Sequence, residues 1–142
     1  MRYMFSGASS FNKDIGTCDV SSVTDMQFMF NVSSSFSRDI ITWNVLNVIS
    51  TKSVFREAVS FNKDIRTWSV LSVTSMKCMF YNASFFNINI SSWDVLSIID
   101  MGGMFYISSS FNGNISICGG SSVTDMAYMF GGASSFNSNI ST

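Results

Sequence analysis

The sequence predicts an α/β solenoid built from 25-residue units, and three observations lead to this prediction. The first is a fixed period, because the chain of 142 residues aligns in rows of 25 without any insertion. The second is an apolar-x-x-apolar-x-apolar segment in each unit, which suits a strand. The third is a following segment whose apolar residues recur at helical spacing.

The period appears as columns of like residues, one from each unit. One column is Phe5, Phe30, Phe55, Phe80, Phe105 and Phe130, a second is Phe11, Phe36, Phe61, Phe86, Phe111 and Phe136, and a third is Cys18, Trp43, Trp68, Trp93 and Cys118. Fixed self-similarity of this kind is typical of stacked repeats, in which each unit covers its apolar face with its neighbours. We therefore expect residues of one column to touch, and Trp43, Trp68 and Trp93 to form a buried ladder.

Within one unit, the apolar spacing changes from that of a strand to that of a helix. Ile65, Trp68 and Val70 suit a strand with Ser69 pointing outward. The next apolar residues are spaced 3, 3, 1 and 3 apart, which predicts a short helix: Val73, Met76, Met79, Phe80 and Ala83. Gly7, Asn82 and Gly132 suit a left-handed exit from that helix. Each unit is thus predicted to place parallel strands on one face and short helices on the other.

Composition limits the function classes. No apolar run approaches the length of a membrane span, and no basic patch suits nucleic acid. The chain has no histidine and no glycine-rich phosphate loop, so we expect no enzyme activity, cofactor or metal site. Calcium on the column Asp14, Asp39 and Asp64 is an alternative, but the glycine-rich motif of calcium-binding coils is absent. All eight Lys and Arg lie within residues 1–77, whereas residues 78–142 carry only three Asp.

Two further columns carry structural predictions. An asparagine column (Asn12, Ser37, Asn62, Asn87, Asn112, Asn137) is expected to bond the backbone of adjacent units. Cys18 and Cys118 lie four units apart, about 19 Å at a strand spacing of about 4.8 Å, which is too far for a disulfide. We expect residues 1–142 to form a single array of about 5.7 repeats without visible caps, either a piece of a longer array or a polymerising unit.

The consensus M-F-x-x-A-x-x-F-N-x-D-I-x-x-W-D-V-x-x-V-x-x-M resembles the repeat of BspA-like leucine-rich-repeat surface proteins. The resemblance is to the 25-residue branch found in bacterial surface lipoproteins and microalgal repeat proteins. It covers essentially the whole chain and departs from the pattern at Cys18, Cys118, Gly119 and Gly120 and in residues 51–58. It implies a leucine-rich-repeat-like right-handed coil, located outside the cell or at its surface, with a role in adhesion, recognition or extracellular structure.

The outward strand positions are the expected contact surface, as in leucine-rich repeats. The candidate binding face is Thr17, Asp19, Thr42, Asn44, Arg66, Thr67, Ser69, Ser92 and Asp94. Candidate N-glycosylation sites are Asn31 and Asn82 at the expected helix exits, and Asn89, Asn114 and Asn139 in a column expected to be structural.

Three functions remain open on the sequence. The first is adhesion or protein–protein recognition, with a protein or a glycan as partner. The second is a structural subunit whose copies stack end to end into an extracellular fibre. The third is an ice- or glycan-binding surface, suggested by the column Thr17, Thr42, Thr67 and Thr142, which Ser92 and Ile117 interrupt.

Overall fold

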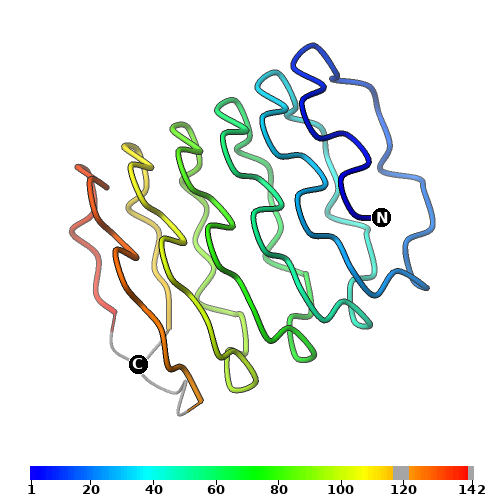
Figure 1. Ribbon diagram of the computed structural model, residues 1–142. Helices are drawn as coiled ribbons and strands as arrows, with labels where there is room; N and C mark the ends of the chain where they lie inside the picture. Colours follow the sequence, from blue (N-terminus) through cyan, green and yellow to red (C-terminus); the bar gives the residue numbers. More distant parts are fainter. Residues whose placement is uncertain (117–121, 141–142) are drawn as a thin grey trace.

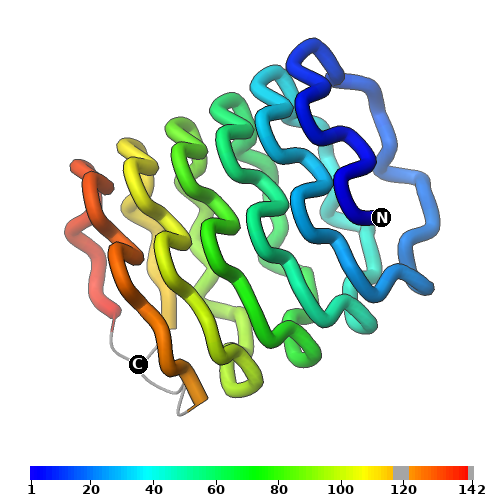
Figure 2. The backbone as a smooth tube through the Cα atoms, viewed as in Figure 1, coloured from blue at the N-terminus to red at the C-terminus, as the bar shows by residue number. Residues whose placement is uncertain are grey.

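The computed structural model describes residues 1–116 and 122–140. The chain winds into coils that lie side by side, from the N-terminal coil at one end to the C-terminal coil at the other (Figures 1 and 2). The first four coils are residues 1–25, 26–50, 51–75 and 76–100. The described residues of the fifth are 101–116 and 122–125, and those of the sixth are 126–140. The predictions that concern Ile117, Cys118, Gly119, Gly120 and Thr142 fall outside the described residues.

The predicted α/β class, with parallel strands on one face and short helices on the other, is wrong. Residues 1–116 and 122–140 contain no helix and no extended strand. Strand-like pairing is limited to isolated parallel bridges, one residue wide, that join successive coils: Asp25 to Ser50, Ser50 to Ser75, Ser75 to Asp100, and Asp100 to Asp125. The backbone of each coil is instead a series of tight turns.

Hydrogen bonds between coils explain why the expected helix over residues 73–83 does not form. In an α-helix every N–H would donate to the carbonyl four residues earlier. Here alternate N–H groups donate to the next coil, as Cys78 does to the carbonyl of Gly102 at 2.9 Å and Phe80 to that of Met104 at 2.9 Å. The N–H groups between them donate three residues back, as Met79 does to Met76 at 3.0 Å. The segment therefore alternates between turns and links to its neighbour.

The expected strand is also a turn. The N–H of Trp68 donates to the carbonyl of Ile65 at 3.1 Å, and Asp64 accepts from the N–H of Arg66 at 2.9 Å. These bonds bend the backbone at the position where the sequence predicts extension. The side chains of Ile65, Trp68 and Val70 are nevertheless buried, so the apolar spacing identifies core residues but not their backbone conformation.

Left-handed backbone recurs at two positions of every coil. The first column has φ between 53° and 60° (Tyr3, Phe28, Ser53, Cys78, Gly103, Tyr128), and the second between 52° and 77° (Gly7, Val32, Glu57, Asn82, Ile107, Gly132). The predicted left-handed conformation of Gly7, Asn82 and Gly132 is confirmed, although it occurs in a turn and not at a helix end. Non-glycine residues rarely adopt this conformation. Here the left-handed turns orient N–H groups toward the next coil, so the cost is offset by inter-coil hydrogen bonds.

The core is a pair of phenylalanine stacks with a tryptophan ladder beside them. Phe55 and Phe61 stack at 3.9 Å within their coil, and Phe55 lies 5.7 Å from Phe80 in the next coil. Trp43 and Trp68 stack at 6.4 Å between ring centroids. The expected contact between residues of one column is therefore confirmed for the phenylalanines and for this tryptophan pair.

Side chains add bonds between coils at fixed positions. Each tryptophan Nε1–H donates to a carbonyl of the preceding coil, as Trp68 does to Ile40 at 3.1 Å and Trp93 to Ile65 at 3.2 Å. The asparagine column bonds the backbone of the next coil as predicted, because the side-chain oxygen of Asn62 accepts from the N–H of Asn87 at 2.9 Å. The same bond recurs for Asn12, Asn87 and Asn112. Polar columns thus help to hold the coils in register.

Candidate interaction surface

The predicted binding face lies on one segment of successive coils. Its members are exposed, except that Ser69 is half-buried: Thr17, Asp19, Thr42, Asn44, Arg66, Thr67, Ser92 and Asp94. The repeat brings them together because each coil places the same positions next to those of its neighbour. The face is therefore continuous from the first coil to the fourth, although it is made of turns and not of strands.

The hydroxyl groups of this face are used in stacking the coils. The hydroxyl of Thr42 donates to the carbonyl of Gly16 at 2.8 Å, and that of Thr67 donates to the carbonyl of Ile41 at 2.9 Å. Ser92, which replaces threonine in the fourth coil, donates in the same way to Arg66 at 3.1 Å. The column is thus explained by structure, and these hydroxyl protons already have an acceptor.

The acidic and amide residues of the face close turns of their own coil. Asp19 accepts from the N–H of Ser21 at 2.9 Å, and Asn44 and Asp94 accept in the same way from Leu46 and Leu96. The hydrogen bonds from Ser21 hold the pKa of the Asp19 carboxyl below its ordinary value. These side chains are therefore turn-stabilising residues first, as short polar side chains commonly are.

Arg66 is the one cation of the predicted face, and its charge is already paired. Its guanidinium contacts the Asp64 carboxylate at 2.7 Å. Hydrogen bonds from Arg66 lower the pKa of Asp64, and the same pairing raises the pKa of Arg66. The predicted face therefore offers an incoming ligand little charge that is not already engaged.

An apolar stripe runs beside the polar face. We call it the leucine stripe, and it consists of five large side chains that are 45 to 54% exposed: Leu46, Ile49, Leu71, Leu96 and Ile99. The turn that follows the buried valine column creates it. For example, the N–H of Val48 donates to the carbonyl of Val45 at 2.9 Å, which places Leu46 at the corner of the turn.

Sequence reasoning did not identify the leucine stripe. The signal that could have found it is the run of leucines immediately after three buried valines, at Val45, Val70 and Val95. In three successive coils the valine of this pair is buried and the leucine after it is about half exposed.

A shallow hollow of about 490 Å³ interrupts the polar face in the first two coils. It surrounds the exposed Cys18, which stands in the column that Trp43 and Trp68 fill in later coils. The carboxylates of Asp14, Asp19 and Asp39 line it. Among residues 1–116 and 122–140, however, no group of three His, Cys, Asp or Glu is placed to hold a metal ion.

The candidate glycosylation sites differ in exposure. Asn31 and Asn82 are half-buried, and the side-chain amide of Asn31 donates to Ser6 Oγ at 3.2 Å. Asn89, Asn114 and Asn139 are exposed, because this column lies on the outside of the turns. Use of any of these sites remains a prediction.

Comparison with known protein families identifies one family that matches this chain. The family described as "Mycoplasma protein of unknown function, DUF285" matches residues 1–91 and 86–142. The chain belongs to this family. No curated protein and no solved structure matches this DUF285 chain. Within the part of the chain that the structure describes, there is no helix of the length and apolar character that crossing a membrane requires.

Proposed function

We propose that the chain is a non-catalytic recognition module that acts outside the cell or at its surface and binds a protein partner through the leucine stripe. The observation that carries this proposal is the stripe itself. It places five large apolar side chains, each about half exposed, in adjacent coils. Contiguous exposed apolar surface in a soluble protein commonly marks an interaction site.

The surroundings of the leucine stripe support a protein partner. Protein interfaces combine an apolar centre with a polar rim. The polar face from Thr17 to Asp94 borders the leucine stripe and supplies such a rim, with little net charge to select a charged ligand. The resemblance to BspA-like surface proteins supports the location and a role in adhesion or recognition.

The test replaces the leucines without disturbing the coil. Serine occupies the same column at Ser21, so Leu46→Ser, Leu71→Ser and Leu96→Ser together use a residue that this turn already holds. Labelled protein is titrated onto intact cells and followed by flow cytometry. We expect saturable binding that is lost in the triple variant and after protease treatment of the cells.

A matched control keeps the test specific. Phe85 is 61% exposed, lies outside the leucine stripe and occupies a column that is otherwise serine. Phe85→Ser removes a similar exposed apolar side chain, so its binding is expected to equal that of the original chain. Equal binding by the triple variant, or binding that survives protease and is lost after glycosidase treatment, would contradict a protein partner.

End-to-end stacking into a fibre is a second candidate. It is supported by opposite charge in the two halves, because Lys and Arg are confined to residues 1–77 and residues 78–142 carry three Asp. Electron microscopy and sedimentation of the purified chain at low and high salt test it. Filaments that shorten at high salt would support stacking, and monodisperse short particles under both conditions would reject it.

A further inference from the structure

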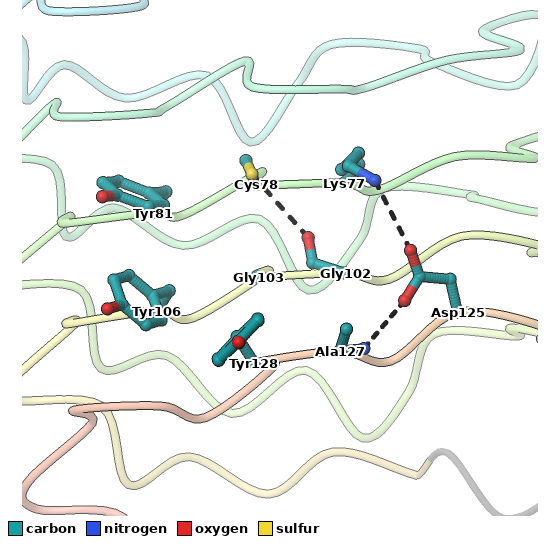
Figure 3. Close-up of a pocket in the computed structure, with 9 residues that line it drawn as sticks. All are labelled: Lys77, Cys78, Tyr81, Gly102, Gly103, Tyr106, Asp125, Ala127 and Tyr128. Atoms are coloured by element: carbon teal, nitrogen blue, oxygen red, sulfur yellow. Dashed lines mark hydrogen bonds and ion pairs between the residues drawn. The ribbon is translucent and has the colours of Figure 1, made fainter.

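A recess opens on the turn segment of the fourth to sixth coils (Figure 3), and none of its lining residues belongs to the predicted binding face. Its volume is about 260 Å³, which is small for a ligand site and suits one flat group. Gly102 and Gly103 form its floor, Tyr106 and Tyr128 line one side, and Lys77 and Asp125 lie at the other.

The recess exists because one column loses its side chains. The second residue of each coil is Arg2, Gln27, Lys52 and Lys77, and then Gly102 and Ala127. The first four coils therefore fill this place with a long polar or basic side chain, and the last two leave it open. A Cβ atom on Gly102 would lie 3.0 Å from Asp125 Oδ2 and 3.2 Å from Asp100 Oδ1, so both carboxylates face the vacated space.

Aromatic rings form the opposite side of the recess. Tyr81 and Tyr106 stack with centroids 5.2 Å apart, and Tyr106 meets Tyr128 edge to face at 6.0 Å with an interplanar angle of 87°. Tyr106 fits closely over Gly131, where a Cβ atom would lie 2.9 Å from the ring. Tyr128 is 76% exposed, which leaves ring surface open to a ligand. Faces of such rings attract cations.

In the first four coils, basic side chains lie over the aromatic rings of this surface. The guanidinium of Arg2 lies 5.7 Å from the centroid of Tyr3, and the Lys52 ammonium lies 5.8 Å from that of Phe28. The guanidinium of Arg56 lies 4.8 Å above Tyr81. Over Tyr106 and Tyr128, no Lys or Arg of the described ranges takes this position. The rings of the fifth and sixth coils thus lack the cation that their counterparts have.

Two carboxylates and one ammonium group meet at the charged end of the recess. Lys77 contacts the carboxylates of both Asp100, at 3.5 Å, and Asp125, at 3.4 Å, so one cation faces two anions. A hydrogen bond from the N–H of Ala127 holds the pKa of Asp125 below its ordinary value, which keeps this carboxylate charged. Arg56 and Lys52 are the other cations near this surface, and they lie over Tyr81 and Phe28, not over Tyr106 or Tyr128.

We propose that this recess binds the guanidinium group of an arginine side chain from a partner polypeptide. The group stacks on the exposed ring of Tyr128, beside the half-buried Tyr106, and faces the Asp125 carboxylate. A guanidinium suits the site better than an ammonium because it is flat and stacks on aromatic rings, as Arg56 does on Tyr81. This adds a second contact to the proposed recognition of a protein, with residues that the leucine stripe does not share.

The test is an NMR titration of the full chain with the peptide acetyl-Gly-Arg-Gly-amide. We expect saturable shifts at Tyr106, Tyr128 and Asp125 that weaken at high salt, because screening reduces the attraction between charges. Two matched peptides carry citrulline or lysine in place of arginine. The citrulline peptide, which has a similar shape and no charge, is expected to bind at least tenfold more weakly, and the lysine peptide to bind between the two.

Three variants place the binding in the recess. Gly102→Lys restores the basic residue found at Lys52 and Lys77, and is expected to abolish the shifts by filling the space. Asp125→Asn keeps an acceptor for the N–H of Ala127 while removing the charge, and is expected to weaken binding several-fold. Tyr128→Leu is expected to do the same.

Tyr3→Leu is the matched control for Tyr128→Leu. Tyr3 and Tyr128 occupy the same left-handed column, with φ of 57° and 56°, and Arg2 already lies over Tyr3. Tyr3→Leu is therefore expected to leave peptide binding unchanged. Circular dichroism melts test whether each variant is folded. If Tyr128→Leu is not folded, Asp125→Asn is used to locate the binding in the recess.

Three results would overturn the proposal. They are equal binding of the arginine and citrulline peptides, unchanged binding by a folded Gly102→Lys, and shifts at these tyrosines with methyl β-galactoside but not with the arginine peptide. The last result would assign the recess to a glycan. The leucine-to-serine variant of the proposed function leaves the recess intact, so failure of one proposal is distinguishable from failure of the other.

Discussion

The middle coils and the outer coils of this chain differ although their sequences follow one pattern. Phe55 and Phe80 are fully buried, whereas Phe5, in the same column of the first coil, is only partly buried. In the methionine column, Met76 is 0% exposed and Met126 is 40% exposed. Burial therefore depends on whether a coil has a neighbour on each side, and not on the residue alone.

The tryptophan column also differs between the middle coils and the first coil, both in burial and in hydrogen bonding. Trp68 is buried and donates its Nε1–H to the preceding coil, whereas Cys18 at the same position of the first coil is exposed. Interior coils therefore gain both apolar burial and an inter-coil hydrogen bond from this column. Cys18 supplies neither to the first coil, whose Ile15 carbonyl only accepts from Trp43, and the hollow around Cys18 lies there instead.

The largest expected effect comes from this column. We expect Trp68→Ala to lower the free energy of unfolding by about 3–5 kcal/mol, because it leaves a cavity and removes the bond to Ile40. Cys18→Ala is expected to change it by less than about 0.5 kcal/mol. Urea denaturation followed by circular dichroism measures both, and losses of similar size would contradict the comparison.

The methionine that precedes each core phenylalanine gives a second test of the difference in burial between the middle coils and the first coil. Met79 is fully buried and Met4 is largely exposed in the same column. Met79→Ala is expected to lower the free energy of unfolding by about 2–5 kcal/mol, and Met4→Ala by less than about 0.5 kcal/mol. The same denaturation experiment measures both. A large loss for Met4→Ala would show that the first coil is packed as tightly as the middle ones.

A smaller effect on stability is expected from the asparagine column, where one substitution should lower stability and another should raise it. Asn62→Ala is expected to cost about 1 kcal/mol, because the N–H of Asn87 loses its acceptor. Ser37 interrupts the column, so Ser37→Asn extends it toward Asn62 and is expected to raise the melting temperature. A decrease for Ser37→Asn would show that the interruption is favourable where it stands.

The smallest expected effect is on pH dependence. The pKa values of Asp19, Asp64 and Asp125 are lowered in the folded chain, chiefly by hydrogen bonds to Ser21, Arg66 and Ala127. The unfolded chain therefore binds more protons, and the stabilisation present above the ordinary aspartate pKa is lost as pH falls through the folded values. Melting temperatures between pH 6 and pH 2 measure this loss. Asp64→Asn is expected to reduce it, and an unchanged profile would argue against a role for the Asp64–Arg66 pair.

Much of the core could be predicted from the sequence, and its backbone could not. The columns predicted that Phe55 and Phe80 touch, and that Asn62 bonds the next coil. The spacing of Val73, Met76 and Met79 also identified buried residues, but it was wrong about a helix. The same spacing is satisfied by a series of turns when a neighbouring coil accepts the alternate N–H groups.

The candidate surfaces were predictable to different degrees. The polar face is exposed because its residues alternate with buried ones in each coil. Its hydroxyls, as at Thr42 and Thr67, turned out to bond the backbone of the preceding coil. The leucine stripe required the structure, because it depends on which residue of an adjacent pair points outward. The recess follows a change that is visible in the sequence, from Lys77 to Gly102 and Ala127 in one column, but only the structure places the tyrosine rings and the Asp125 carboxylate beside it.

The sequence by itself determined the register of the chain. A period without insertions makes each side chain the neighbour of its own kind, whatever the backbone between them does. Only the tertiary structure decided how that backbone runs, because each N–H can satisfy its hydrogen bond within the coil or in the next one. The contacts between coils select the second choice at alternate residues, and turns result where the sequence predicts a helix.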